Sequence, residues 1–152
     1  MARVKLKFPD ENPLFTTIIP VRVNDLNYYN HVGNDSVLTI VHEARMQFLR
    51  SHGFDEINAG GVSLIMADVM IAYKGESFYG DSLTIDLFAE EITEHSFDLL
   101  YRITTVRDNK VINIAQAKTG MVCFNYDIRK IAEMTERLRN LLTNESAKGD
   151  RP

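Results

Sequence analysis

The second half of the chain alternates between apolar and polar positions, which is the pattern of strands with one buried face. This alternation predicts four long strands: Gly61–Tyr73, Ser82–Glu91, Phe97–Val106 and Val111–Asn125. Short polar links at residues 75–81, 93–95 and 107–110 separate the strands. Strands joined by links this short run antiparallel, so the pattern indicates an antiparallel meander.

Before these strands, the apolar positions recur with the period of a helix. Seven residues share one broad face: Val37, Leu38, Ile40, Val41, Ala44, Phe48 and Leu49. The helix is expected to begin around Asn34, Asp35 and Ser36, which are good N-cap types. It should run to about Ser51, with Gly53 as its C-terminal stop. An apolar arc this broad indicates a helix wrapped by a sheet rather than one lying on a surface.

The two flanks of this pattern add one element each. Phe15–Asn24 is rich in Ile, Val and Thr, and it predicts a strand that is broken or bulged near Pro20. Ile128–Leu142 predicts a second helix. Its apolar stripe would contain Ile131, Met134, Leu138 and Leu141. The polar residues 143–152 are expected to be frayed.

Charge and cysteine content narrow the class of protein. The 17 basic and 21 acidic residues leave a net charge of −4, which is no electrostatic footprint for nucleic acid. Cys123 is the single cysteine, so no disulfide framework exists and a reducing compartment is expected. The first residues lack the apolar core of a signal peptide, and no run approaches the roughly 18 apolar residues of a membrane span. We expect a cytoplasmic protein with a single domain over residues 1–152 and a core at about 15–142.

Polar residues gather between the first strand and the long helix. Val21–Asn34 reads VRVNDLNYYNHVGN and is dense in Asp, Asn and His. A helix begins with free backbone N–H groups, so this segment places proton-handling side chains beside groups that can polarise a carbonyl. The four His and one Cys show no metal-ligand spacing, and there is no phosphate loop and no G-x-S-x-G motif. Chemistry without a cofactor or a metal is therefore expected.

The same segment resembles the motif of a known family. Acyl-CoA thioesterases of the 4-hydroxybenzoyl-CoA type carry a pattern similar to V-R-F-x-D-x-D-x-x-G-H-V-N-N, followed by F-E-E-A-R in a helix. Here Val21–Asn34 is followed by VHEAR at residues 41–45. Downstream, IAY at residues 71–73 and YGDSL at residues 79–83 resemble the family's I-x-Y and G-D-x-L. The turn also resembles that of plant acyl-ACP thioesterases, so the acyl carrier stays open.

This resemblance implies a hotdog fold, in which a long central helix is wrapped by an antiparallel sheet of about five strands, here with a short C-terminal helix. It also implies hydrolysis of an acyl thioester, with acyl-CoA as the expected substrate and acyl-ACP as the alternative. In the family the active sites lie between protomers, which implies a homodimer or homotetramer. Two rival interpretations are a non-catalytic acyl-binding protein and another hotdog enzyme, such as a hydroxyacyl dehydratase.

One departure from the family motif concerns catalysis. The family's usual catalytic carboxylate is the second Asp of D-x-D, and Asn27 stands at that position. An amide cannot take a proton from water at neutral pH, although it can orient a water or donate to a carbonyl. The candidate substitute bases are Asp25 and Glu43, the latter from the facing protomer. Each has a structural alternative: Asp25 as a turn-stabilising residue or ion-pair partner, and Glu43 as part of a solvated or interface face.

The residues after Asn27 are the candidate substrate-binding group. His31 is expected to bind the substrate or hold a water, or else to bond the backbone of the turn. With Val32, the helix-opening residues Gly33 and Asn34 would present N–H groups to a thioester oxygen, unless they form an ordinary helix start. Arg45 falls within the apolar arc of the helix, where a charge needs a partner. A structural ion pair is therefore expected there.

Overall fold

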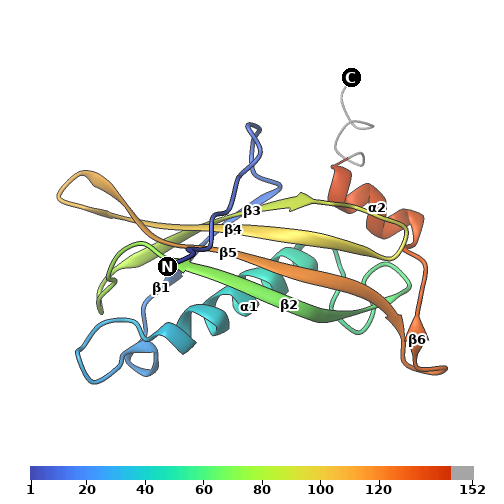
Figure 1. The fold of residues 1–152 in the computed structure, drawn as a ribbon, viewed down its shortest axis with the longest axis horizontal. Helices are drawn as coiled ribbons and strands as arrows, with labels where there is room; N and C mark the ends of the chain where they lie inside the picture. The colour runs from blue at the N-terminus through green and yellow to red at the C-terminus, as the bar shows by residue number, and fades with distance from the viewer. Residues whose placement is uncertain (145–152) are drawn as a thin grey trace.

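The computed structural model describes residues 1–144, and Figure 1 shows how their elements are arranged. The elements follow one another as β1 (Phe15–Pro20), the 3₁₀ turn η1 (Val23–Asp25), α1 (Asn34–Ser51), β2 (Ser63–Tyr73), β3 (Ser82–Glu90), β4 (Ser96–Arg107), β5 (Lys110–Asn125), β6 (Lys130–Ile131) and α2 (Glu136–Thr143). Within residues 1–144, the helices are too short or too polar to cross a membrane.

The strands form one sheet in the order β1-β3-β4-β5-β2, and the two-residue strand β6 pairs with the end of β5. Every pairing is antiparallel. Strand β2 lies beside β5 and not beside β3, so the predicted meander of four strands is wrong for β2 and holds only for β3, β4 and β5. The long helix α1 lies along one face of this sheet (Figure 1). The predicted α+β hotdog arrangement is therefore confirmed, and each of the four long strands lies within two residues of its predicted ends. Strand β6 brings the sheet to six strands.

The core lies between α1 and the sheet face that it covers. Six of the seven residues of the predicted apolar arc are buried, and the seventh, Leu38, is half-buried. From β4, the alternate residues Leu99, Tyr101 and Ile103 face this core, as the two-residue period of a strand requires. Val41, Ala44 and Phe48 are fully enclosed between the helix and the sheet.

The ends of α1 agree with the prediction except at the N-cap. The helix spans Asn34–Ser51, and Gly53 follows with a φ of 75°, which a residue without Cβ adopts at little cost. The N-cap is Gly33, in extended conformation, and no side chain caps the helix through a hydrogen bond. The first turn of α1 therefore lacks the side-chain cap that the run Asn34–Ser36 suggested.

The predicted first strand, Phe15–Asn24, was too long. Strand β1 pairs with β3 only as far as Pro20, opposite Ser82. The next residue, Val21, donates its N–H to the carbonyl of Asp81 at 3.0 Å, and the chain then tightens into η1. Proline supplies no N–H for a continued ladder, so the chain leaves the sheet here and begins the polar turn.

The predicted second helix, Ile128–Leu142, was also too long. Lys130 and Ile131 pair with β5 instead, which satisfies their backbone in the sheet. Helix α2 begins only at Glu136, where the Thr135 hydroxyl accepts the N–H of Leu138 at 3.2 Å. Leu138 and Leu141 are buried as predicted, whereas Ile131 is exposed. Most of the predicted frayed tail, residues 145–152, lies outside the described residues.

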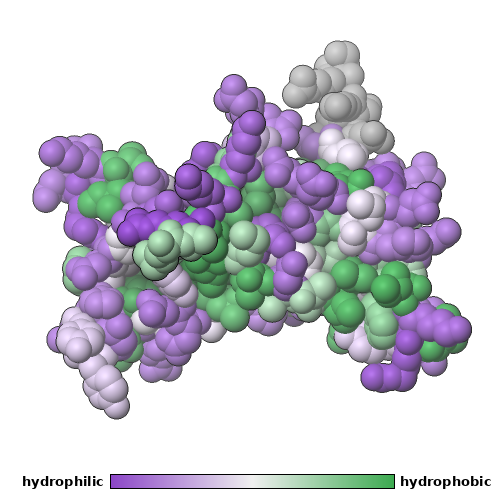
Figure 2. Space-filling view, in the orientation of Figure 1, coloured by the Kyte–Doolittle hydropathy of each residue, from purple (hydrophilic) through white to green (hydrophobic). Residues whose placement is uncertain are grey.

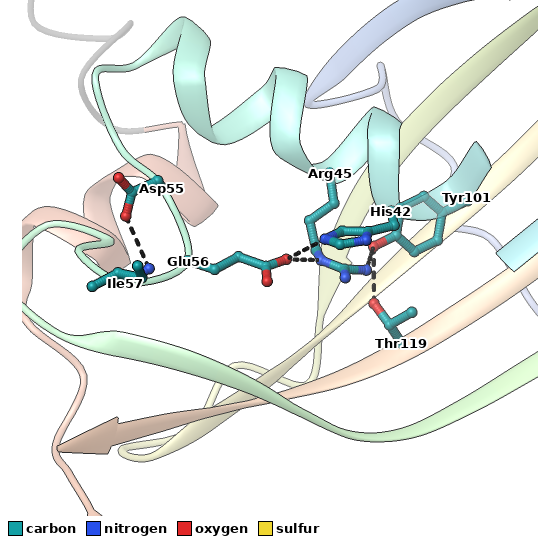
Figure 3. A network of polar contacts seen from close by, with 7 residues as sticks. All are labelled: His42, Arg45, Asp55, Glu56, Ile57, Tyr101 and Thr119. Carbon is teal, nitrogen blue, oxygen red and sulfur yellow. Dashed lines mark hydrogen bonds and ion pairs between the residues drawn. The ribbon is translucent and has the colours of Figure 1, made fainter. Parts of the chain in front are cut away.

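A buried ion pair crosses the core at the middle of α1 (Figure 3). Arg45 is only 4% exposed, and its Nε donates to Oε1 of Glu56 at 2.6 Å. Its NH1 donates to the hydroxyl of Tyr101 at 3.3 Å, and that hydroxyl lies 2.9 Å from the hydroxyl of Thr119. The expected structural partner of Arg45 is thus Glu56, in the loop after α1, with Tyr101 on β4 as a second acceptor.

The electrostatics of this group favour a charged Arg45. Burial acts to lower the pKa of Arg45, but Tyr101 and Glu56 outweigh burial and hold the pKa above its ordinary value. The pKa of Tyr101 is raised, because burial outweighs the opposing effect of Arg45. The tyrosine therefore stays a neutral hydroxyl, able to accept from Arg45 and donate to Thr119 at once.

We predict that Tyr101→Phe destabilises the fold, because it leaves the Arg45 NH1 and the Thr119 hydroxyl without a shared partner in a dry core. The expected loss in the free energy of unfolding is about 1–3 kcal/mol, measured by urea denaturation. Tyr79→Phe is the matched control, because Tyr79 is 65% exposed. Equal stability of the two variants would contradict a role for the Tyr101 hydroxyl.

Candidate active site

The polar segment between β1 and α1 folds as a compact hairpin-like turn at the N-terminal end of the helix (Figure 1). Leu26 and Val32 form an antiparallel bridge, and the N–H of Asn27 donates to the carbonyl of His31 at 2.9 Å. Asn30 has a φ of 62°. The family pattern has Gly there, and Asn is among the residues that tolerate this left-handed conformation best. The departure at this position therefore preserves the shape of the turn.

Asp25 is engaged in an ion pair inside this turn. Its Oδ2 accepts the backbone N–H of Arg22 at 2.8 Å and the Nε of Arg22 at 3.3 Å, and its Oδ1 accepts NH2 at 3.2 Å. The residue is 3% exposed, and its carbonyl accepts the N–H of Gly33 at 2.9 Å. Asp25 thus ties the beginning of the turn to the residue that caps the helix.

Asn27 and His31 are brought side by side. The side-chain Oδ1 of Asn27 accepts the N–H of Tyr29 at 2.9 Å, which directs its Nδ2 toward Nδ1 of His31 at 3.4 Å. The same Nδ1 lies 3.3 Å from the carbonyl of Val32, and the ring of Tyr29 stacks against the imidazole. The other ring nitrogen, Nε2, takes part in none of these contacts. An amide and an imidazole therefore form one pair at the turn.

The backbone N–H groups at the helix start are partly used within the protein. The N–H of Val32 donates to the carbonyl of Ser77 at 2.8 Å, and that of Gly33 to Asp25. The N–H groups of Asn34 and Asp35 come next, in the first turn, where α-helical N–H groups have no partner of their own in the helix. A Cβ at Gly33 would lie 2.7 Å from Oδ1 of Asp35, so glycine keeps this approach open.

Glu43 lies apart from the turn within one chain. It stands nine residues after Asn34, about 13 Å farther along the helix axis at 1.5 Å per residue. Its Oε1 accepts from Nε2 of Gln47 at 2.9 Å, and Gln47 in turn accepts from the hydroxyl of Thr17 on β1. The structure therefore brings Asn27, His31 and the helix start together, but it does not bring Glu43 to them.

A second segment borders the turn and was not singled out as functional from the sequence. The loop at residues 75–81 pairs with the turn through the His31–Phe78 bridge. Tyr73, at the end of β2, donates its hydroxyl to the carbonyl of Asn34 at 2.9 Å. Tyr73 belongs to the I-x-Y stretch and Phe78 directly precedes the YGDSL stretch, and the resemblance of these stretches to the family motif was the available signal.

A large hollow lies at the other end of α1. It has a volume of about 870 Å³ and is bounded by the loop after α1 and the end of β5. Its walls include Glu56, Ile57, Leu64, Tyr126 and Asp127. The turn with Asn27 and His31 borders none of it, so one chain alone does not enclose the candidate site in a deep pocket.

The described residues hold no group of three or more His, Cys, Asp and Glu side chains that could bind a metal ion. Cys123 is buried, and burial raises the pKa of its thiol to about 11. A thiolate nucleophile therefore does not form at this cysteine near neutral pH. The chemistry left to the turn is hydrogen bonding, proton transfer by an imidazole and polarisation by backbone N–H groups.

Known proteins resemble this chain in sequence and in fold. The chain is 28% identical over 127 residues to the long-chain acyl-CoA thioesterase FadM of Escherichia coli, covering 83% of this chain and 95% of that protein. It is 33% identical over 110 residues to a 1,4-dihydroxy-2-naphthoyl-CoA hydrolase of Acaryochloris marina, covering 69% and 78%. The crystal structure of a 1,4-dihydroxy-2-naphthoyl-CoA thioesterase from Synechocystis has the same fold, with a TM-score of 0.76, 23% identity and coverage of 91% and 98%.

The family model of the thioesterase-like superfamily matches residues 21–142. This match begins at Val21, the first residue of the polar turn, and ends within α2, so it contains the turn, the long helix and all the strands of the meander. The hotdog fold, the motif of the turn and the family model agree, and the chain belongs to the thioesterase-like superfamily.

Proposed function

We propose that this protein hydrolyses acyl-CoA thioesters to a free acid and CoA, without a cofactor. The observation that carries the proposal is the Asn27–His31 pair beside the N-terminus of α1, within the stretch that the superfamily model matches. The relatives named above act on acyl-CoA and on an aryl-CoA thioester, which supports CoA over an acyl carrier protein. We also propose that residues 1–152 form one domain and that the protein acts in the cytoplasm.

The helix start supplies the electrostatic part of the mechanism. The N–H groups of Asn34 and Asp35 face the thioester oxygen, where negative charge develops as water attacks the carbonyl. The positive end of the α1 dipole acts in the same direction. The N–H of Gly33 does not face the thioester, since it already donates to the carbonyl of Asp25.

His31 supplies the proton transfer. A water beside Nε2 of His31 gives a proton to that nitrogen and attacks the carbonyl carbon; the proton then passes to the departing CoA thiolate. In the tautomer with its proton on Nδ1, His31 donates to the Val32 carbonyl and leaves Nε2 free to accept; the Asn27 Nδ2 group then lies beside the ring without a hydrogen bond to Nδ1. We assign Asp25 a structural role, because Arg22 already occupies both of its oxygens. Glu43 takes part only if a second copy of the chain brings it to the turn.

Binding without catalysis is the second candidate function, and Asn27 is the observation that favours it. The position lacks the carboxylate that the family motif carries, and an amide cannot activate water as a base. Acyl-CoA would then bind at the same turn with no release of thiol. Thiol release by the wild-type protein distinguishes the two functions, and Asn27→Asp and His31→Gln then address the proton-transfer step.

Asn27→Asp is expected to raise the rate of hydrolysis. The new carboxylate can keep the bond to the Tyr29 N–H through one oxygen and activate water with the other, and general-base catalysis is typically worth about 10²–10⁴-fold. The measurement is thiol release from acyl-CoAs of several chain lengths. Asn30→Asp is the matched control, since Asn30 is exposed in the same turn. An unchanged rate in Asn27→Asp would argue that this turn is not the catalytic centre.

His31→Gln is expected to lower kcat by about 10²–10⁴-fold with a small change in KM, because glutamine retains hydrogen bonding but cannot accept the proton. Asp25→Asn should instead lower thermal stability, because the buried partner of Arg22 loses its charge. Steady-state kinetics and thermal denaturation of both variants separate the roles. If Asp25→Asn lost turnover at wild-type stability while His31→Gln kept it, Asp25 would be the base.

We further propose that the protein is a homodimer or homotetramer that pairs through β2. This strand is one edge of the sheet, and it leaves Met66, Val69 and Tyr73 partly exposed. Figure 2 shows apolar side chains gathered near the middle of the face along which β2 runs in Figure 1. A long exposed edge of this kind invites pairing with another chain. A second copy could also close the site that one chain leaves open.

Light scattering at micromolar concentration is expected to give the mass of a dimer or a tetramer. Met66→Lys, which places a charge on the apolar edge, should shift that mass toward the monomer, whereas Ile18→Lys on the opposite edge strand β1 should not. A monomeric wild-type protein would contradict both the pairing and a shared site.

A further inference from the structure

The loop at residues 75–81 is organised around one carboxylate. Oδ2 of Asp81 accepts the backbone N–H of Phe78 at 2.9 Å, the hydroxyl of Ser77 at 3.0 Å and NH2 of Arg107 at 3.0 Å. The same NH2 donates to the carbonyl of Glu76 at 2.8 Å. Three donors converging on a single oxygen give the loop one backbone shape, because moving any of them breaks a charge-assisted hydrogen bond.

This loop holds the candidate catalytic turn at both of its ends. At the beginning, the carbonyl of Asp81 accepts the N–H of Val21. At the far end, the carbonyl of Ser77 accepts the N–H of Val32, and Phe78 bridges to His31. Two of the three donors to Oδ2 of Asp81, Ser77 and Phe78, are thus residues whose backbones contact the turn. The path from the carboxylate to the imidazole runs through one residue, Phe78.

Arg107, the last residue of β4, adds a contact with the Phe78 ring to this loop, but it leaves one of its own nitrogen atoms unpaired among the described residues. Its guanidinium carbon lies 5.1 Å from the centre of the Phe78 ring. Among the described residues, its Nε is a buried polar atom with no hydrogen-bond partner. An unpaired buried donor disfavours the folded state. The other contacts of the guanidinium, with Asp81, Glu76 and the Phe78 ring, fix the geometry of the loop despite this cost.

The carboxylate keeps its charge under the conditions in which hydrolysis would occur. Burial acts to raise the pKa of Asp81, but the bonds from Phe78, Arg107 and Ser77 outweigh burial, and the pKa lies below its ordinary value. The side chain is 12% exposed, so little water competes for these bonds. The contacts around Asp81 are therefore in place throughout the neutral range.

We propose that Asp81 is a positioning residue for the catalytic turn: through the Ser77 and Phe78 backbone it fixes His31 and Val32, and so aims the Asn27–His31 pair at the helix start. This inference rests on the proposed function for its kinetic consequence. Its structural consequence, the rigidity of the turn, is independent of any activity.

The test compares Asp81→Asn with Asp86→Asn. Both residues lie in the same stretch of chain, and each pairs with an arginine of β4. Asp86, on β3, lies 3.6 Å from Arg102. Unlike Asp81, Asp86 contacts neighbouring strands of the sheet and not the turn. We expect Asp81→Asn to speed backbone hydrogen exchange in residues 26–33, most of all at Val32, and Asp86→Asn to leave that segment unchanged. Thermal denaturation of both variants shows whether any change is local.

The kinetic readout uses the same two variants. Because misplacing a catalytic group by about 1 Å can cost 10²-fold in rate, we expect Asp81→Asn to lower kcat by about 10- to 100-fold with little change in KM. Arg107→Lys keeps a charge beside Asp81 but cannot reach Glu76 as well, so it should show an intermediate loss. A loss of stability that speeds exchange throughout the core would mean that Asp81 is merely structural, and would overturn the proposal.

Two further outcomes separate this proposal from the proposed function. If the wild-type protein releases no thiol, the function fails, while faster exchange confined to residues 26–33 in Asp81→Asn would still support the positioning. If Asp81→Asn leaves both exchange in this segment and turnover at the wild-type level, the positioning is wrong whatever the activity. Ser77→Ala, which removes only one donor to Asp81, serves where Asp81→Asn does not fold, and it should speed exchange at Val32 in the same way.

Discussion

The burial of one face of α1 against the sheet is the constraint on which the rest of the molecule depends. A helix of this length is marginal in water by itself, and the sheet has no other element of comparable size to cover its inner face. Val41, Ala44 and Phe48 are wholly enclosed by this contact. The first turn of α1 consequently has one position relative to the strands. The N–H groups that would polarise a thioester are thus placed by the hydrophobic core rather than by a cap, since no side chain caps the helix.

Polar contacts fix the rotation and the starting position of α1, which the apolar contact alone leaves free. Arg45, Glu56 and Tyr101 connect the middle of α1 to the loop after it and to β4, and Tyr73 connects its first turn to β2. Removing one member of such a buried group leaves its partners unsatisfied, so their geometry is tightly constrained. At the other end, Arg22 and Asp25 do the same for the turn. The helix therefore has a fixed rotation and a fixed start, which a purely apolar interface would not ensure.

The geometry of the turn explains how it accommodates the amide of Asn27, where the family motif has a carboxylate. The amide keeps the bond to the Tyr29 N–H that a carboxylate would also make, so the shape of the turn survives. What changes is the ability to take a proton from water. The nearby Asp25 does not simply replace it, because Arg22 holds that carboxylate in the wall of the turn. The imidazole of His31, with one nitrogen outside these contacts, is the group left at the turn that can accept a proton.

Local periodicity was sufficient for most of the fold. The arc from Val37 to Leu49 and the alternation after residue 61 are properties of neighbouring residues, and they determined the helix and the four long strands, whereas the place of β2 beside β5 was decided by the tertiary structure. The sequence also determined that Arg45 needed a partner, because a charge within an apolar arc must be compensated. The motif from Val21 to Asn34 located the turn, since its spacing is read directly along the chain.

Only the tertiary structure decided which groups meet. The partner of Arg45 is Glu56, and the carboxylate that organises the loop beside the turn is Asp81, in a loop whose Phe78 pairs with His31 far earlier in the chain. The end of β1 is also decided by the fold, because the N–H of Val21 donates to the carbonyl of Asp81 and the chain then turns into η1. Such choices depend on distances between segments that no local pattern encodes. The sequence therefore determined the secondary-structure elements and the segment that contains the candidate site. Long-range packing decided which contacts each polar residue makes.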